Sequence, residues 1–226
     1  FQTHLTTFRL NYMDFISYFK HIELTEDDHL PMLPMGRARS SEALKTMKSP
    51  RESAVGIHCF PCAAGKLSIF LIQRSEYQGK HSGQIAFPGG KKEADDPDLI
   101  YTARRECYEE VGISMHEGEY IRSLSPVYIP VSNFKMTPYF FYHETQPITI
   151  HNEREVQQII PLSLDALAHH LPIEHRKLEI EENSLFTRQV PGFVHDTHWI
   201  WGATALVLQQ LRIAYSNYSK QFLELS

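Results

Sequence analysis

The chain has 226 residues, of which 42% are hydrophobic and 22% are charged, and its formal net charge is -5. This length and composition are ordinary for a globular protein with one hydrophobic core. The negative charge argues against general nucleic-acid binding, which requires a basic surface, and no apolar run is long enough to span a membrane. No secretory leader opens the sequence at Phe1, so we expect a cytoplasmic location, although a leader removed before this residue would not be visible.

The first 52 residues contain few strand patterns. A short helical pattern covers residues 12–22, and a proline-rich stretch containing Pro31 and Pro34 follows it. A polar run then continues to about Glu52. We therefore predict that residues 1–52 form a helical and extended appendage, which packs on a single domain formed by residues 53–226.

The remaining elements alternate irregularly along the chain. Their patterns predict strands at 54–60, 67–73, 84–87, 120–124, 139–143, 156–160 and 187–190, and helices at 163–170 and 202–215. We found no internal repeat and no glycine pattern typical of a P-loop or a dinucleotide-binding turn. The order of elements favours an α/β protein in which a mixed sheet is held between helices.

Cys59 and Cys62 form a CxxC pattern, which can indicate a redox pair or half of a zinc site. A redox pair would be expected to open a helix, and a zinc site would need a second pair. Here the pair ends a strand-like run and leads into an Ala-Gly-Lys turn. We expect structural cysteines, including Cys107 in the core, and keep a redox protein as a weak alternative.

The most informative segment is the run Arg-Glu-Cys-Tyr-Glu-Glu-Val-Gly-Ile at residues 105–113. The preceding Asp96-Pro97-Asp98 predicts a helix start, with Asp96 as the capping acid and Pro97 at the first helical position. Gly112 predicts the helix end. At about 100° per residue, one buried arc contains Leu99, Ile100, Ala103, Cys107 and Val111.

Three glutamates lie on or beside this arc. Glu110 falls inside it, Glu106 lies on its edge, and Glu109 lies about one step further round. A solvated acidic face would lie opposite the apolar arc, whereas these carboxylates overlap it, where mutual repulsion and burial are both costly. We therefore expect them to converge on a cation. Clustered carboxylate oxygens suit Mg²⁺ or Mn²⁺, which also binds substrate phosphates.

These residues resemble the Nudix box, the signature of hydrolases that cleave nucleoside diphosphates linked to another moiety. The match comprises Gly90, Arg105, Glu106, the pair Glu109-Glu110 and Gly112. The first acid of the box is Asp96 instead of glutamate, and eight residues instead of seven separate it from Arg105. Both departures are familiar in the coenzyme A diphosphatase-like branch of the family.

A second motif of that branch lies just upstream. The segment Phe-Leu-Ile-Gln-Arg-Ser at residues 70–75, followed by Gly83 and by Phe-Pro-Gly-Gly at residues 87–90, resembles a framework associated with coenzyme A recognition. Gly79 stands where that motif has an arginine, and Lys80 and His81 are its neighbours. Lysine does not reproduce the bidentate fork of arginine. The resemblance to the branch covers most of residues 54–208.

The resemblance implies a Nudix α/β/α sandwich and a role for each acidic residue. Glu106 and Glu110 are expected to bind the metal, and Glu109 to contribute a ligand or orient the attacking water. Arg105 is expected to hold a glutamate by an ion pair. The general base is expected to be Glu109 or Glu155, an acid outside the box whose alternative is a solvated surface position.

The resemblance also implies a small nucleotide-type substrate, with coenzyme A or its thioesters as the first choice. The residues expected to contact it are Arg74, Ser75, Lys80, His81, Gly83, Phe87, Gly89, Gly90 and Lys91. The alternatives are another Nudix substrate, such as ADP-ribose, NADH or a dinucleoside polyphosphate, and a non-catalytic module that senses a nucleotide-like ligand. Dimers are common in the family, so a homodimer is one expectation. Neither a nucleic acid nor a membrane is an expected partner.

Overall fold

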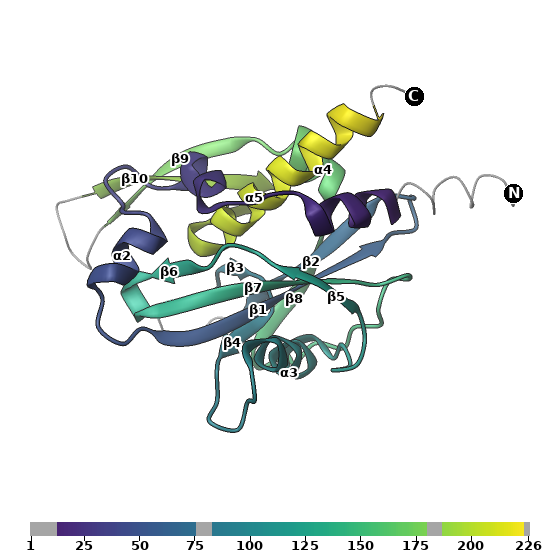
Figure 1. Ribbon diagram of the computed structural model, residues 1–226, viewed down its shortest axis with the longest axis horizontal. Coiled ribbons are helices and arrows are strands. Elements are labelled where there is room, and N and C mark those ends of the chain that lie inside the picture. Colours follow the sequence, from purple (N-terminus) through teal and green to yellow (C-terminus); the bar gives the residue numbers. More distant parts are fainter. Residues whose placement is uncertain (1–12, 76–82, 180–186, 224–226) are drawn as a thin grey trace, which may run out of the picture.

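The computed structural model describes residues 13–75, 83–179 and 187–223 (Figure 1). Its helical elements are a helix at 13–21, η1 (Glu26–Met32), α2 (Ser40–Thr46), α3 (Leu99–Val111), η2 (Pro130–Ser132), α4 (Leu164–His169), α5 (Gly202–Tyr218) and η3 (Ser219–Leu223). Its strands are β1 (Arg51–Pro61), β2 (Leu67–Arg74), β3 (Ile85–Ala86), β4 (Gly89–Lys91), β5 (Glu119–Ser123), β6 (Val127–Ile129), β7 (Phe134–Tyr142), β8 (Val156–Ser163), β9 (Ile173–Glu179), β10 (Thr187–His195) and β11 (His198–Trp201). No helix in these ranges is both long and apolar enough to cross a membrane.

The main sheet has the strand order β3-β2-β1-β7-β5, with β4 paired to β1, β6 to β7 and β8 to β2. The strands β1 and β7 are parallel, and the other pairs are antiparallel. In Figure 1, α3 covers one face of this sheet and α5 lies on the opposite face. The structure thus confirms the predicted α/β fold with a mixed sheet between helices.

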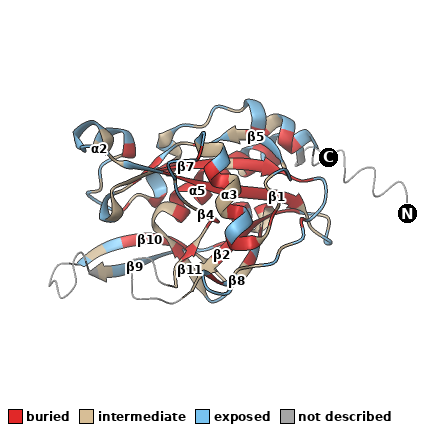
Figure 2. Ribbon diagram, turned by 90° about the horizontal axis from the view of Figure 1, so that it is seen from below, coloured by how far each residue is buried: buried red, intermediate tan, exposed pale blue. Residues whose placement is uncertain are grey.

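A second, antiparallel sheet has the strand order β11-β10-β9 and lies on the α5 side (Figure 1). The sequence patterns indicated only the first part of β10. The strand β9 was missed because its sequence is largely charged, and its residues 173–177 are exposed (Figure 2). The strand β11 has only four residues and runs directly into α5, so it lacks the turn signal that normally bounds a strand.

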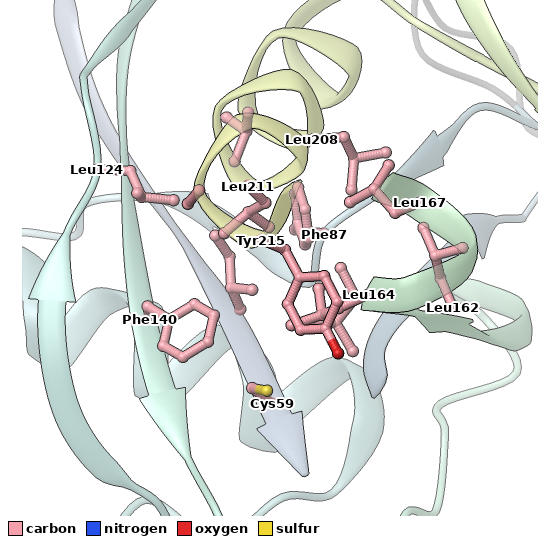
Figure 3. Packing of buried hydrophobic residues seen from close by; sticks show 14 of the residues in the cluster. Cys59, Phe87, Leu124, Phe140, Leu162, Leu164, Leu167, Leu208, Leu211 and Tyr215 are labelled. Carbon is pink, nitrogen blue, oxygen red and sulfur yellow. The ribbon is translucent and has the colours of Figure 1, made fainter. Parts of the chain in front are cut away.

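The larger hydrophobic core lies between the main sheet and α5 (Figure 3). Alternation along β1 sends Ile57 and Cys59 into this core and Phe60 toward the opposite face, where it joins Cys107 and Val111 of α3. Cys59, Cys62 and Cys107 are free thiols. Burial raises the pKa of both the Cys59 and the Cys107 thiol, which is typical of inert cysteines in a core.

The N-terminal residues that the structure describes share the core of the domain. Phe15, Phe19 and Met32 are buried in the same cluster as α5. The Phe19 and Phe140 rings lie with their centroids 4.6 Å apart, which joins the first helix to β7. The strand β1 begins at Arg51, so the boundary predicted between residues 52 and 53 falls inside this strand.

Candidate active site

The acidic helix α3 begins two residues later than predicted. Asp98, not Asp96, is the N-cap, and its side chain accepts a hydrogen bond from the Tyr101 backbone N–H at 2.7 Å. Asp96 is unavailable as a cap because its two oxygens accept from Nε and Nη2 of Arg105, each at 3.0 Å. Gly112 ends the helix as predicted, with a φ of 74°.

Arg105 is the centre of the charged group on α3. Its Nη1 lies 3.0 Å from Glu106 Oε1 and 3.0 Å from Glu109 Oε2, in addition to its paired contacts with Asp96. The Arg105 guanidinium holds the pKa of the Asp96 carboxyl at about 2, well below its usual value. One partly buried arginine therefore orients two of the three box glutamates and is itself fixed by Asp96.

Glu110 is the most deeply buried acid of the box, with a side-chain exposure of 1%. Its Oε1 accepts from Arg74 Nη1 at 3.1 Å, and its Oε2 accepts from the Gly89 backbone N–H at 2.8 Å. Burial outweighs these donors and raises the pKa of Glu110 to about 7. Burial likewise raises the pKa of Glu106, against the lowering effect of Arg105.

The two glycines before α3 make room for these carboxylates. A Cβ atom at Gly90 would lie 2.5 Å from the carboxylate atoms of Glu106. At Gly89 a Cβ atom would overlap the carbonyl oxygen of Ala54 on β1, and the φ of 155° is one that other residues rarely adopt. Any larger residue at position 90 would displace Glu106 or the strand β4.

Glu155 approaches the same group from outside the helix. It is exposed, and its charge raises the pKa of both Glu106 and Glu110. Its backbone carbonyl accepts a hydrogen bond from the Ser75 N–H at 2.9 Å, and the Ser75 hydroxyl donates to the Glu153 carbonyl at 3.1 Å. A surface cavity beside this segment is lined by Ser75, His151, Glu153, Val156 and Gln157.

The described carboxylates do not form a preformed metal-binding site. In the described part of the chain, no three acidic, histidine or cysteine side chains are grouped as ligands of one ion. The predicted convergence of the three glutamates on one cation is therefore incomplete. Glu106 and Glu109 form ion pairs with Arg105, whereas Glu110 is bound by Arg74 and by the Gly89 N–H.

The charge balance of this group nevertheless fits a divalent cation. Two guanidinium groups, those of Arg74 and Arg105, contact four carboxylates: Asp96, Glu106, Glu109 and Glu110. With every group ionised, this leaves two negative charges without a positive partner inside the group. Oxygen donors with surplus negative charge are the ligands that a hard divalent ion favours.

The other residues expected to contact a substrate differ in exposure, and two of them lie outside the described residues. The expectation that Phe87 contacts the substrate is wrong. Its ring is 2% exposed and packs in the core against α5 (Figure 3), where it cannot contact a substrate. Lys91 is exposed, and its backbone carbonyl accepts from Arg105 at 3.1 Å. Gly83 has a φ of 68°. Lys80 and His81, like Gly79, lie outside the described residues.

Sequence reasoning assigned Asp96 to helix capping and missed its pairing with Arg105. The pairing crosses the first turns of α3, so helical periodicity alone gives no signal for it.

Comparison with known proteins identifies the family. The NUDIX domain family matches residues 51–182. The mitochondrial coenzyme A diphosphatase NUDT8 of Mus musculus is 30% identical over 146 residues, which cover 62% of this chain and 67% of the mouse protein. The uncharacterised Nudix hydrolase NudL of Pectobacterium atrosepticum is 32% identical over 180 residues, covering 77% of this chain and 88% of that protein.

Among solved structures, the Nudix hydrolase RenU of M. smegmatis superposes with a TM-score of 0.48 and 13% sequence identity, covering 82% of this chain and 95% of that one. The family match includes β1, β2, the glycine turn and all of α3. It therefore contains every box residue on which the resemblance was based. The chain belongs to the Nudix family and is a hydrolase of the kind that acts on phosphorus-containing anhydrides.

Proposed function

We propose that this chain is a Mg²⁺- or Mn²⁺-dependent diphosphatase that cleaves coenzyme A or its thioesters. The products would be adenosine 3',5'-bisphosphate and 4'-phosphopantetheine or its acyl derivative. The observation that carries the reaction class is the buried Glu110, held beside Glu106 and Arg105 on α3 with surplus negative charge. The substrate assignment is supported by the upstream motif and by the relatives that are named coenzyme A diphosphatases.

Nudix hydrolases generally use divalent metals. When bound here, such an ion would neutralise diphosphate oxygens and lower the pKa of an attacking water. Glu106 and Glu110 would hold it, with Glu109 as a further ligand or as the group that orients the water. These ligands would have to be ionised, so binding would release the proton that burial favours on Glu110.

The residues around the ligands would fix their positions. Arg105 would keep Glu106 and Glu109 in place through its ion pairs, and Arg74 would do the same for Glu110. In the chemical step, water attacks one phosphorus, the bridging P–O bond breaks, and the attacking water's proton passes to the general base. Glu109 and Glu155 are the two candidates for this base, and both are exposed enough to exchange a proton with solvent.

The test is a substrate panel with purified protein and either Mg²⁺ or Mn²⁺. The panel comprises coenzyme A, an acyl-coenzyme A, ADP-ribose, NADH and a dinucleoside polyphosphate, with products identified by mass spectrometry. We expect the highest kcat/KM for coenzyme A or its thioester and a loss of at least about 10³-fold in Glu110→Gln, corresponding to about 4 kcal/mol of transition-state stabilisation. Asn217→Asp, an exposed change on α5, serves as the control.

Each alternative gives a different result in the same panel. Cleavage of ADP-ribose with coenzyme A ignored would overturn the substrate assignment and leave the reaction class intact. Nucleotide binding without turnover of any compound would favour a ligand sensor. A cytoplasmic location and a homodimer remain proposals, which fractionation of cells and sedimentation of the purified protein would test.

A further inference from the structure

The segment at residues 150–155 is attached to the C-terminal end of α3. The Ile150 N–H donates to the Val111 carbonyl at 3.0 Å, and the Asn152 N–H donates to the Glu110 carbonyl at 3.0 Å. These bonds satisfy two of the carbonyls that a helix leaves without partners at its C-terminus. Gly112 permits the approach, since a Cβ atom there would lie 2.8 Å from the Ile150 carbonyl oxygen.

Asn152 connects this attachment to Glu155. Its side-chain Nδ2 donates to Glu155 Oε1 at 3.3 Å, and its Oδ1 accepts from the Arg154 N–H at 3.2 Å. Its carbonyl accepts from the N–H groups of Glu155 at 2.9 Å and Val156 at 2.8 Å. A single residue therefore bonds the backbone of Glu110 on one side and the carboxylate of Glu155 on the other.

Ser75 holds the segment from a second direction. It follows Arg74 directly, and Arg74 contacts the Glu110 carboxylate. The two bonds from Ser75 reach the carbonyls of Glu153 and Glu155. Thus the backbone of Glu155 is fixed relative to Glu110 both by Ser75, which directly follows β2, and by α3. The Glu155 carboxylate accepts a hydrogen bond from Asn152.

We propose that Asn152 is a positioning residue that holds the Glu155 carboxylate toward Glu106 and Glu110. This inference rests on the proposed function, because it assigns Glu155 a part in the reaction. An exposed glutamate otherwise samples several rotamers, and a hydrogen bond from an uncharged amide restricts them without neutralising the carboxylate. Asparagine suits this role because its amide offers a donor to Glu155 and an acceptor to Arg154 at the same time.

Two substitutions separate positioning from a purely structural role. Asn152→Asp retains the oxygen that accepts from Arg154 but replaces the donor to Glu155 by a repelling oxygen, whereas Asn152→Ala removes both. We expect both variants to lose about 10- to 100-fold in kcat with little change in KM, the range seen when a supporting partner of a site is removed. Asn217→Asp is the matched control on α5 and should retain wild-type kinetics.

A double-mutant cycle with Glu155→Gln tests whether Asn152 acts through Glu155. We expect Asn152→Ala to cause no further loss of kcat in the Glu155→Gln background. An equal loss in both backgrounds, or wild-type kcat in a folded Asn152→Asp protein, would overturn the proposal. Circular dichroism confirms that each variant is folded.

A measurement that does not depend on turnover distinguishes failure of the positioning role of Asn152 from failure of the proposed function. In protein with ¹³C-labelled glutamate, the side-chain carboxyl resonance missing from Glu155→Gln identifies Glu155. We expect added Mn²⁺ to broaden this resonance more strongly in the wild type than in Asn152→Asp. Equal broadening in the two proteins would refute positioning, whether or not any diphosphate is cleaved. Inactivity of the wild type with unequal broadening would reject only the proposed function.

Discussion

The two faces of the main sheet bury apolar and charged side chains in different proportions. On the α5 face, aliphatic and aromatic residues such as Phe140, Leu208 and Tyr215 fill a large core (Figure 3). On the α3 face, the apolar clusters are smaller, and Glu110, Thr102 and Asp96 are buried. One face thus provides most of the apolar burial, and the other holds charges at a cost that the first offsets.

Phe140→Ala should have the largest effect and should act on stability alone. The ring is fully buried on the α5 face and contacts Phe19, so its removal leaves a cavity that costs about 4 kcal/mol in the free energy of unfolding. Chemical denaturation measures this loss. The kcat of the remaining folded protein at low temperature should match that of the wild type. A large fall in kcat would show that packing on the α5 face also controls activity on the α3 face.

Arg105→Ala should weaken both stability and activity. It leaves buried Asp96 without its charged partner, which we expect to cost about 3 kcal/mol at pH 7. Because the folded-state pKa of Asp96 is lowered to about 2, its stabilising contribution is present above about pH 4 and disappears as the pH falls through 2. Denaturation at pH 7 and pH 3 should show the difference between the two proteins shrinking.

The double variant Arg105→Ala/Asp96→Asn is the control for that experiment. It removes the uncompensated charge, so it should recover most of the lost stability. It should not recover kcat, because Glu106 and Glu109 still lack the cation that orients them. Recovery of kcat together with stability would mean that Arg105 affects turnover only through folding.

Glu110→Gln should stabilise the metal-free protein at high pH. Burial raises the pKa of Glu110 from 4.5 to about 7, so its protonated form favours the folded state below pH 4.5, and this advantage is lost as the pH rises through 7. This shift in the pKa of Glu110 corresponds to a change of up to about 3 kcal/mol in the free energy of unfolding. Glutamine cannot ionise, so the stability of the variant relative to the wild type should increase between pH 4 and pH 9 in the presence of a chelator.

Glu109→Gln is the matched control, since the Glu109 side chain is 48% exposed. The pH-dependent gain in stability over this range should be smaller in Glu109→Gln than in Glu110→Gln, because burial acts on Glu110. If both variants showed the same pH dependence, burial of Glu110 would not be its cause.

Cys62→Ser should have the smallest effect. Cys62 is a free thiol directly after β1, outside the charged group on α3. We expect a change of less than about 0.5 kcal/mol in stability and an unchanged kcat with or without a reductant. Loss of turnover in the folded variant would revive the redox interpretation of the CxxC pattern.

Local patterns were sufficient for the elements that carry a clear apolar arc or a cap. Burial of Ala103, Cys107 and Val111 on α3, the helix end at Gly112 and the start of α4 near Ser163 were predicted from such signals, whereas Leu99 and Ile100 of the predicted arc are only partly buried. The strand β4 was missed because its sequence, Gly-Gly-Lys, has the composition of a turn, and it becomes a strand only by pairing with β1. Burial of Glu110 followed from periodicity, because position on a helix decides which side faces the sheet.

The partners of the carboxylates depended on contacts that no local pattern contains. Arg74 meets Glu110 across 36 positions of sequence, and Asn152 meets the end of α3 through a segment between β7 and β8. The sequence motif indicated Arg74 as a substrate contact, which stays a prediction, but gave no sign that its guanidinium pairs with Glu110. Phe87 is similar: its motif position suggested the site, but alternation of the chain turned its ring into the core.

Binding of Mn²⁺, followed by electron paramagnetic resonance, is the most direct test of whether the acidic face of α3 holds a divalent cation. We expect the wild type and the exposed control Glu23→Gln to bind Mn²⁺ with equal affinity. The double variant Glu106→Gln/Glu110→Gln should bind it at least about 100-fold more weakly, because two charged oxygen ligands are lost. Equal Mn²⁺ affinity in this variant and the wild type would contradict the assignment of the metal to α3.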